Sequence, residues 1–345
     1  MTKRRKTGMF RIVATIALAS CWLGCSRSTP VWSGRQGPPR VVVTIPALDN
    51  FVRSVGGDHV GVVCLCTAQG PHHYQYNAQD AILLREADLF FAIGLSLDDK
   101  FADPIQIESH NPHLHYVKLG DRLRDDDEKR KEKLLLRLPE HEEHGKEEEH
   151  EHGHDHEHGE FDPHIWLGIP QAIALVEIIR DELKKADPTN AGDYDKNAAK
   201  YIEKLKELHA YGKERLKDKK NRKIIAFHES LGYFAKSFDI DIVDVLEVNP
   251  GAEANQAHMV KLAKECKEKD VRVIAVEPQY PTETSAKLLR DAMKDKEKEI
   301  TFVEIDPLET ADKKDLKEDE KELKDPEWYD KKMRQNLDNL AKSLP

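Results

Sequence analysis

Residues 223–248, KIIAFHESLGYFAKSFDIDIVDVLEV, contain two apolar, β-branched runs on either side of a helical stretch. The pattern predicts a strand at 223–227, a helix at 229–237 and a second strand at 242–248. Two such strands joined by a helix form a βαβ unit, which is typical of a parallel sheet covered by helices. This stretch therefore predicts an α/β fold.

The same alternation recurs on both sides of this unit, so we expect two doubly wound, mostly parallel sheets. The remaining strands are predicted at Arg40–Ile45, Val60–Cys66, Leu89–Ile93, Val271–Val276 and Ile300–Ile305. The remaining helices are predicted at Asp49–Val55, Ala78–Ala87, Asn255–Lys269, Thr282–Lys294 and Asp325–Leu344.

Two further helical stretches, Pro170–Ala186 and Tyr194–Leu216, separate the halves. In the second, large and small apolar residues recur at steps of four and three, which is the period of an amphipathic helix. These residues are Tyr194, Ala198, Tyr201, Leu205 and Leu208. We expect one long helix that joins the two halves and packs this stripe against the core.

A histidine-rich acidic tract, HEEHGKEEEHEHGHDHEH, occupies residues 141–158 within a hydrophilic loop at 121–160. Such a composition does not build a core, but imidazole and carboxylate groups are ligands for divalent metals. Its histidines are His141, His144, His150, His152, His154, His156 and His158. We interpret the tract as an auxiliary metal-binding loop; the alternative is a solvated low-complexity loop.

The N-terminus has the pattern of an export signal. The basic residues 3–6 precede a short apolar run at 12–19, which is below the length of about 20 residues that a membrane span needs. Small residues precede Cys21 and Cys25, as in the lipobox of bacterial lipoproteins. We expect a signal peptide at 1–25, lipid on one of the two cysteines, and a flexible tether at 26–39.

Composition limits the other possibilities. The net charge of −10 argues against nucleic-acid binding, which needs a basic face. Beyond the signal only Cys64, Cys66 and Cys266 remain, which is too few for a disulfide framework. We expect them to be small buried thiols.

Four side chains follow predicted strands or precede a predicted helix. They are His72, His164, His228 and Asp306. In parallel α/β sheets the ligand site lies beyond the carboxyl ends of the strands, so these side chains are candidates for one site. Three imidazoles and a carboxylate match a tetrahedral zinc site. The alternative for each histidine alone is a hydrogen-bonded surface or core residue, and Asp306-Pro307 is also a common turn former.

These residues lie in motifs that resemble the metal-binding components of bacterial ABC importers for zinc and manganese, including the zinc-uptake type with a histidine-rich loop. The motifs are Gly70-Pro71-His72-His73-Tyr74, Asp162-Pro163-His164-Ile165-Trp166, Phe227-His228-Glu229-Ser230-Leu231-Gly232-Tyr233-Phe234-Ala235, Asn249-Pro250-Gly251-Ala252-Glu253, Glu277-Pro278-Gln279, Asp306-Pro307-Leu308 and Trp328-Tyr329 to Asn336-Leu337. The resemblance extends in order from about Arg40 to the end of the chain. One departure is Gly70, where the family usually has Asp.

The resemblance implies two α/β lobes joined by a rigid long helix, with one metal in the cleft between them. The lobes are expected at 40–170 and 222–345, with the helical region at 171–221. It also implies that His72, His164 and His228 are ligands, and the third histidine favours zinc, since the manganese branch tends to have glutamate there. For the fourth ligand, Glu277 and Glu229 compete with Asp306, and the neighbouring His73 is placed to substitute for His72.

The expected function is that of the extracytoplasmic solute-binding component of an ABC transporter, with Zn2+ as cargo and Mn2+ as the less favoured ion. The expected partners are a permease, its ATPase and, through the lipid, a membrane, with the protein itself monomeric in the periplasm or at the cell surface. The alternatives are an extracytoplasmic zinc buffer or adhesin without a transporter and a secreted zinc hydrolase. The hydrolase is disfavoured because none of the predicted helices carries a His-Glu-x-x-His motif.

Overall fold

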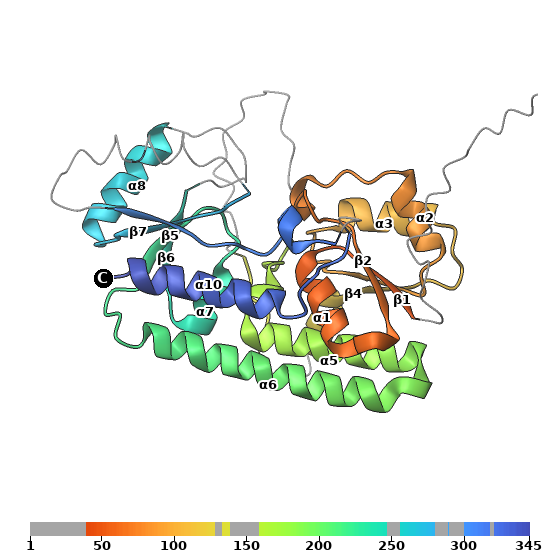
Figure 1. Cartoon of the computed structure of the whole chain (residues 1–345). Helices are drawn as coiled ribbons and strands as arrows, with labels where there is room; N and C mark the ends of the chain where they lie inside the picture. Colours follow the sequence, from red (N-terminus) through yellow and green to blue (C-terminus); the bar gives the residue numbers. More distant parts are fainter. Residues whose placement is uncertain are drawn as a thin grey trace, which may run out of the picture. The chain divides into compact units, whose positions relative to one another are not determined.

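The computed structural model describes residues 39–127, 133–138, 159–246, 256–279, 289, 300–317 and 321–345, which build two four-stranded parallel sheets (Figure 1). The first sheet, in the order β2-β1-β3-β4, consists of β1 (Arg40–Val43), β2 (Gly61–Cys64), β3 (Leu89–Ala92) and β4 (His115–Lys118). The second, in the order β6-β5-β7-β8, consists of β5 (Lys223–Ala226), β6 (Asp241–Val245), β7 (Val273–Val276) and β8 (Thr301–Glu304). The prediction of two doubly wound, mostly parallel sheets is confirmed.

The two sheets share one topology, in which the first strand of each half lies between the second and the third. The connections of an open sheet leave in opposite directions at this switch point, so the carboxyl ends of the first and third strands flank a ligand position. The central strands are buried on both faces, because residues 41–43 and 224–226 are apolar and almost fully covered. The topology thus directs the loops after β5 and β7 toward a site.

Nine helices are described. Their bounds are α1 (Pro46–Gly56), α2 (Ala78–Arg85), α3 (Asp99–Glu108), α4 (Leu119–Asp127), α5 (Ile169–Ala186), α6 (Ala191–Leu216), α7 (Gly232–Phe238), α8 (Gln256–Glu268) and α10 (Trp328–Ser343). Among these described residues, none of the helices is both long and apolar enough to cross a membrane. The predicted helix at 282–294 lies outside the described residues, except for Leu289.

The structure corrects the prediction that a loop begins at residue 121. Residues 119–127 form α4, because Leu119 and Leu123, one turn apart, are both fully buried despite the charged residues around them. The structure also adds α3 and β4, which the apolar pattern did not indicate. The seven histidines of the acidic tract lie outside the described residues, as do Cys21, Cys25 and the rest of the predicted signal. The boundaries at 40–170, 171–221 and 222–345 stay a prediction.

The long helix α6 has 26 residues, or about 39 Å at 1.5 Å per residue, and lies side by side with α5 (Figure 1). The predicted stripe from Tyr194 to Leu208 is buried. Toward the first half, the Tyr201 hydroxyl donates to Oδ1 of Asn50 on α1 over 2.9 Å. Toward the second half, α6 contacts α7 and α10. The helix therefore packs against elements of both halves.

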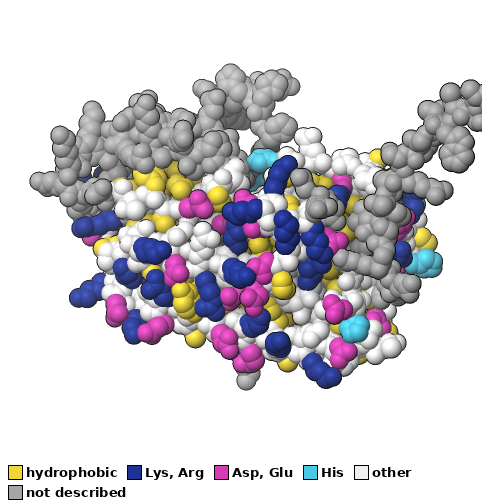
Figure 2. Space-filling model, in the orientation of Figure 1, with side chains coloured by type: hydrophobic (Ala, Val, Ile, Leu, Met, Phe, Trp, Pro, Cys, Tyr) yellow, Lys and Arg dark blue, Asp and Glu magenta, His cyan; other side chains and the backbone are white. Residues whose placement is uncertain are grey.

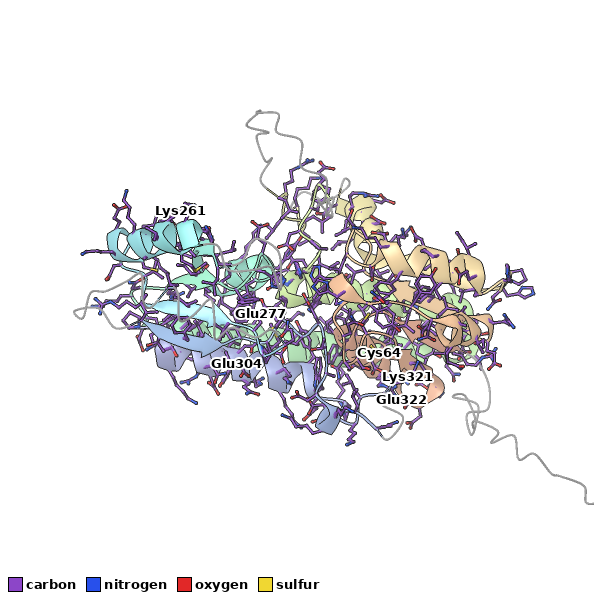
Figure 3. All side chains as sticks on the ribbon, turned by 90° about the horizontal axis from the view of Figure 1, so that it is seen from above. Cys64, Lys261, Glu277, Glu304, Lys321 and Glu322 are labelled. Atoms are coloured by element: carbon purple, nitrogen blue, oxygen red, sulfur yellow. The ribbon has the colours of Figure 1, made fainter. Side chains whose placement is uncertain are left out.

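The segment after β8 returns to the first sheet. The Ala311 amide donates to the Thr67 carbonyl over 2.8 Å, and the Cys64 amide on β2 donates to the Lys321 carbonyl over 3.0 Å. Figure 3 shows Lys321 and Glu322 beside Cys64. The outer edge of β2 is thus covered by the C-terminal part of the chain.

Cys64, Cys66 and Cys266 are free and buried, as predicted, and burial raises the pKa of all three thiols. The face in Figure 2 shows Lys and Arg side chains interspersed with Asp and Glu. Individual surface ion pairs of this kind contribute only about 0–1 kcal/mol, so the buried stripes and strands supply most of the stability of the fold.

Gly212 marks the closest approach of α6 to its neighbours, since a Cβ there would lie 2.3 Å from Phe238 and 2.9 Å from Leu337. We expect Gly212→Ala to lower the free energy of unfolding by about 1–3 kcal/mol through overpacking. The matched control is Gly192→Ala on the same helix, where a Cβ meets nothing within 4 Å. The control should leave the free energy of unfolding unchanged or raise it by up to about 1 kcal/mol. Urea unfolding measures both, and equal effects would contradict the packing argument.

Candidate metal centre

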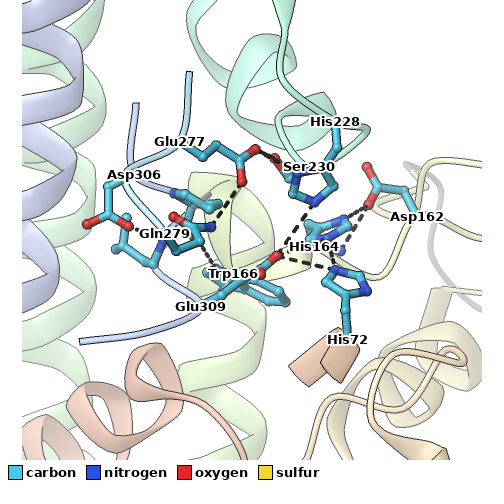
Figure 4. A network of polar contacts seen from close by, with 12 residues as sticks. His72, Asp162, His164, Trp166, His228, Ser230, Glu277, Gln279, Asp306 and Glu309 are labelled. Carbon is cyan, nitrogen blue, oxygen red and sulfur yellow. Dashed lines mark hydrogen bonds and ion pairs between the residues drawn. The ribbon is translucent and has the colours of Figure 1, made fainter. Parts of the chain in front are cut away.

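Three histidines and one glutamate from four separate segments converge on one point (Figure 4). His72 lies in the 3-10 turn η2 (Pro71–His73) after β2, and His164 lies just before the turn η3 (Ile165–Leu167) and α5. His228 follows β5, and Glu309 follows β8. Their ligand atoms all lie within 4.8 Å of one another. His164, His228 and Glu309 are buried, and His72 is partly exposed.

The Glu309 carboxylate is the meeting point of the three rings. Its Oε1 lies 3.4 Å from Nε2 of His72, 3.3 Å from Nε2 of His164 and 3.7 Å from Nε2 of His228. Nε2 of His72 lies 3.3 Å from Nε2 of His164. Gly70 allows this approach, because a Cβ at that position would lie 3.2 Å from the other carboxylate oxygen. Any side chain at position 70 would therefore crowd the Glu309 carboxylate.

The Asp-Pro-His motif positions His164. The backbone amide and Nδ1 of His164 both donate to Oδ1 of Asp162, over 2.9 and 2.8 Å. The Tyr233 hydroxyl donates to the Asp162 carbonyl over 2.8 Å, and a Cβ on Gly232 would lie 2.7 Å from Asp162 Oδ2. Gly232 and Tyr233, which follow His228, thus contact the loop that carries His164. The motif around His228 therefore helps to position His164.

Glu277 positions His228 from the far side of the ring. Its Oε1 lies 2.6 Å from Nδ1 of His228 and accepts a hydrogen bond from the Ser230 hydroxyl over 3.1 Å. Its other oxygen accepts from Gln279 over 2.9 Å. Glu277 was one candidate for the fourth ligand. In the structure it orients a histidine, and it does not belong to the group of converging ligand atoms.

Asp306 is likewise outside this group, which corrects its prediction as the fourth ligand. Its Oδ1 accepts from the Leu308 amide over 2.8 Å, and its Oδ2 accepts from Lys332 over 2.9 Å. The Asn336 side chain accepts a hydrogen bond from the Asp306 amide and donates one to the Asp306 carbonyl. Leu308 has φ +62, in the left-handed region, and the chain bends there just before Glu309. Asp306 therefore stabilises the turn that presents Glu309.

The two other candidates are also placed. Glu229 is half-buried and His73 is exposed, and neither belongs to the converging group. Sequence reasoning missed Glu309, although a signal existed, since it is the next carboxylate after Asp306 beyond the same strand. A turn that redirects the chain at Leu308 cannot be recognised from apolar periodicity.

The buried charges shift the titration of the site. Burial by itself lowers the pKa of His164, but the hydrogen bonds to Asp162 and Glu309 outweigh it and raise the pKa to about 10. Burial opposes the charged form of His228 too, but Glu277 raises its pKa above the ordinary value. For His72 burial dominates and lowers the pKa. Burial opposes the charge on Glu309, yet the three imidazoles hold its pKa well below the usual range.

The metal-free protein should therefore keep His164 protonated up to about pH 10. We expect the ring resonances of His164, followed by NMR, to titrate far above the ordinary histidine range. Asp162→Asn removes the carboxylate at Nδ1 and should lower this pKa. Asp193→Asn, which removes the carboxylate next to the distant His59, is the matched control and should leave the His164 titration unchanged. A midpoint for His164 near its ordinary value would contradict the ion-pair geometry.

Comparisons with known proteins agree with this architecture. A family model described as zinc-uptake complex component A, periplasmic, matches residues 41–343. The zinc-binding lipoprotein AdcA of Streptococcus pneumoniae is 30% identical over 316 residues, which is 90% of this chain and 58% of the relative. The metal ABC transporter substrate-binding lipoprotein FimA of Streptococcus parasanguinis is 25% identical, covering 79% of this chain and 83% of the relative.

Among solved structures, the Zn(II)-bound ZnuA-like domain of S. pneumoniae AdcA superposes with a TM-score of 0.65 at 25% identity. The alignment covers 89% of this chain and 99% of that domain. The periplasmic zinc-binding protein TroA of Treponema pallidum superposes with a TM-score of 0.69 at 21% identity, covering 89% and 99%, and shows the same fold. The chain spans 56–58% of the length of the AdcA relatives it matches.

Proposed function

Because the chain belongs to the family of zinc-uptake complex component A, periplasmic, we propose that it is the extracytoplasmic solute-binding component of an ABC transporter. In this proposal it captures Zn2+ with His72, His164, His228 and Glu309 and delivers the ion to a membrane permease. The observation that carries the proposal is the spacing of these four ligand atoms.

The spacing matches a tetrahedron around zinc. Ligands at about 2.0–2.1 Å from a tetrahedral zinc are separated from one another by about 3.3–3.4 Å. The oxygen of Glu309 lies 3.3–3.7 Å from the three imidazole nitrogens, and two of those nitrogens are 3.3 Å apart. These four separations lie within a few tenths of an ångström of the tetrahedral value, and all the ligand atoms lie within 4.8 Å of one another.

The chemistry of the ligands favours zinc over manganese. Three imidazole nitrogens and one oxygen suit Zn2+, whereas Mn2+ is better matched by oxygen ligands in a six-coordinate site. The fourth position is occupied by the buried Glu309, which fills the place that a catalytic zinc keeps open for water. This arrangement suits the capture and release of an ion as cargo and requires no chemical step.

The partners follow from the family. A solute-binding component works with a permease and an ATPase, and a lipid on Cys21 or Cys25 would keep it at a membrane, in the periplasm or at the cell surface. The histidine-rich tract at 141–158 would collect zinc at low affinity beside the main site. Both segments lie outside the described residues, so these assignments rest on the sequence.

Removal of single ligands tests the proposal. We expect wild-type protein to bind one Zn2+ tightly, and Glu309→Gln to bind it at least about 10–100-fold more weakly, because the buried negative charge is lost. The matched control is Glu304→Gln, an exposed carboxylate at the end of β8. Asp306→Asn should have a smaller effect than Glu309→Gln, since an amide oxygen still accepts from Leu308. Titration calorimetry in a protein lacking residues 141–158 measures all four, and tight binding by Glu309→Gln would exclude it as a ligand.

Zinc binding should also release protons. His164 carries a proton at neutral pH in the metal-free protein because its pKa is raised to about 10, and zinc binds only the neutral ring. The apparent affinity should therefore rise with pH up to about 10 and fall as the pH decreases. Calorimetry near neutral pH in buffers of different ionisation enthalpy should show about one proton or more released per zinc. Asp162→Asn should release fewer, and a heat that is independent of the buffer would contradict the prediction.

A further inference from the structure

The three imidazoles of the centre are held unequally. His164 and His228 each direct Nδ1 at a buried carboxylate, 2.8 Å from Asp162 and 2.6 Å from Glu277. A carboxylate at one ring nitrogen fixes the tautomer and the orientation of the ring and leaves the other nitrogen for a metal. In both residues the nitrogen left for the metal is Nε2, which faces Glu309.

His72 is not supported in this way. Within the part of the chain that the structure describes, no carboxylate lies within ion-pair distance of its Nδ1, and its polar contacts to His164 and Glu309 both involve Nε2. Its side chain is 21% exposed, against 5% for His164 and 4% for His228. The short turn that carries it is closed at the surface by a hydrogen bond from Gln69 to the His73 carbonyl.

The consequence is a difference in how easily each ring leaves the metal. If His164 or His228 swings away, a buried carboxylate loses its partner, which is unfavourable in a low-dielectric interior. If His72 swings away, its ring moves toward solvent and no second-shell charge is left behind. Side-chain rotation at a partly exposed position is also less hindered than a movement that repacks a buried one.

We propose that His72 is the exchange ligand of this centre, which binds last as zinc enters and detaches first as zinc leaves. His164, His228 and Glu309 form a preorganised three-ligand site that retains the ion while His72 detaches and another ligand takes the fourth coordination position. An incoming nitrogen, oxygen or sulfur donor reaches the metal at the position that His72 vacates. This inference rests on the proposed function, because it assumes that the centre holds zinc.

The test compares zinc release from wild-type protein and from His72→Ala, His164→Ala and His228→Ala. Zinc-loaded protein is mixed with excess EDTA in a stopped-flow instrument, with and without free imidazole. We expect His72→Ala to keep one bound zinc, to release it at least about tenfold faster than wild type, and to be slowed by imidazole. His164→Ala and His228→Ala should bind at least about tenfold more weakly than His72→Ala and should not be rescued, because their positions are buried.

A second comparison separates the supporting carboxylate from general damage to the fold. Glu277→Gln should weaken zinc binding about 10–100-fold by releasing His228, whereas the exposed Glu304→Gln should leave it unchanged. In wild-type protein with 15N-labelled histidine, the zinc-bound ring of His72 should show more exchange broadening than the rings of His164 and His228. This measurement needs no variant, so it decides the question even if an alanine variant does not fold.

Equal losses in the three alanine variants, or equal broadening of the three rings, would overturn the inference and leave the proposed function intact. The inference would also be overturned if free imidazole slowed zinc release from His164→Ala but not from His72→Ala. If the variant that lacks residues 141–158 but keeps all four ligands failed to bind zinc at all, the proposed function would fail, and the inference with it.

Discussion

The burial of one carboxylate is the constraint on which the rest of the centre depends. Glu309 is fully buried, and a charge in that position is stable only when opposite charges or hydrogen-bond donors compensate for it. The compensation comes from His72, His164 and His228, which belong to three other segments of the chain. Both sheets must therefore form before this charge is paired, and the fold and the site stabilise each other.

Residues that do not contact the ligand atoms fix the positions of the segments that carry the ligands. The Trp166 indole donates to the Pro307 carbonyl over 2.8 Å, which links the His164 loop to the turn before Glu309. The Tyr329 hydroxyl on α10 donates to the Trp166 carbonyl over 2.6 Å. Together with Asn336, these contacts tie the end of the chain to the centre. The motifs surrounding the histidines therefore serve the geometry of the site as much as the histidines do.

The sequence was sufficient for the central strands, because the short apolar, largely β-branched runs at 41–43 and 224–226 alternate with helical stretches, as is typical of buried parallel strands. It did not indicate β4, whose residues HYVK are partly exposed at an edge and form no apolar run. It indicated His72 and His228 through their positions after strands, and His164 through its position before a helix, and the motifs around all three resemble those of a metal-binding family. It failed at Glu309, because the apolar pattern does not reveal that Leu308 adopts the left-handed conformation, and Asp306 was taken as the carboxylate ligand in its place.

The way the halves are connected bears on how cargo can be exchanged. The segment after β8 is anchored on the first sheet, where the partly buried Arg53 lies between the buried carboxylates of Asp49, at 2.5 Å, and Glu322, at 3.4 Å. Because Asp49 and Glu322 are buried, leaving either carboxylate without its cation would be unfavourable. Separation of the two sheets would have to disrupt either this anchoring of the segment after β8 or the packing of α6 against both halves. A movement confined to the surface turn that carries His72 disrupts neither, so exchange through that ligand is the less costly route.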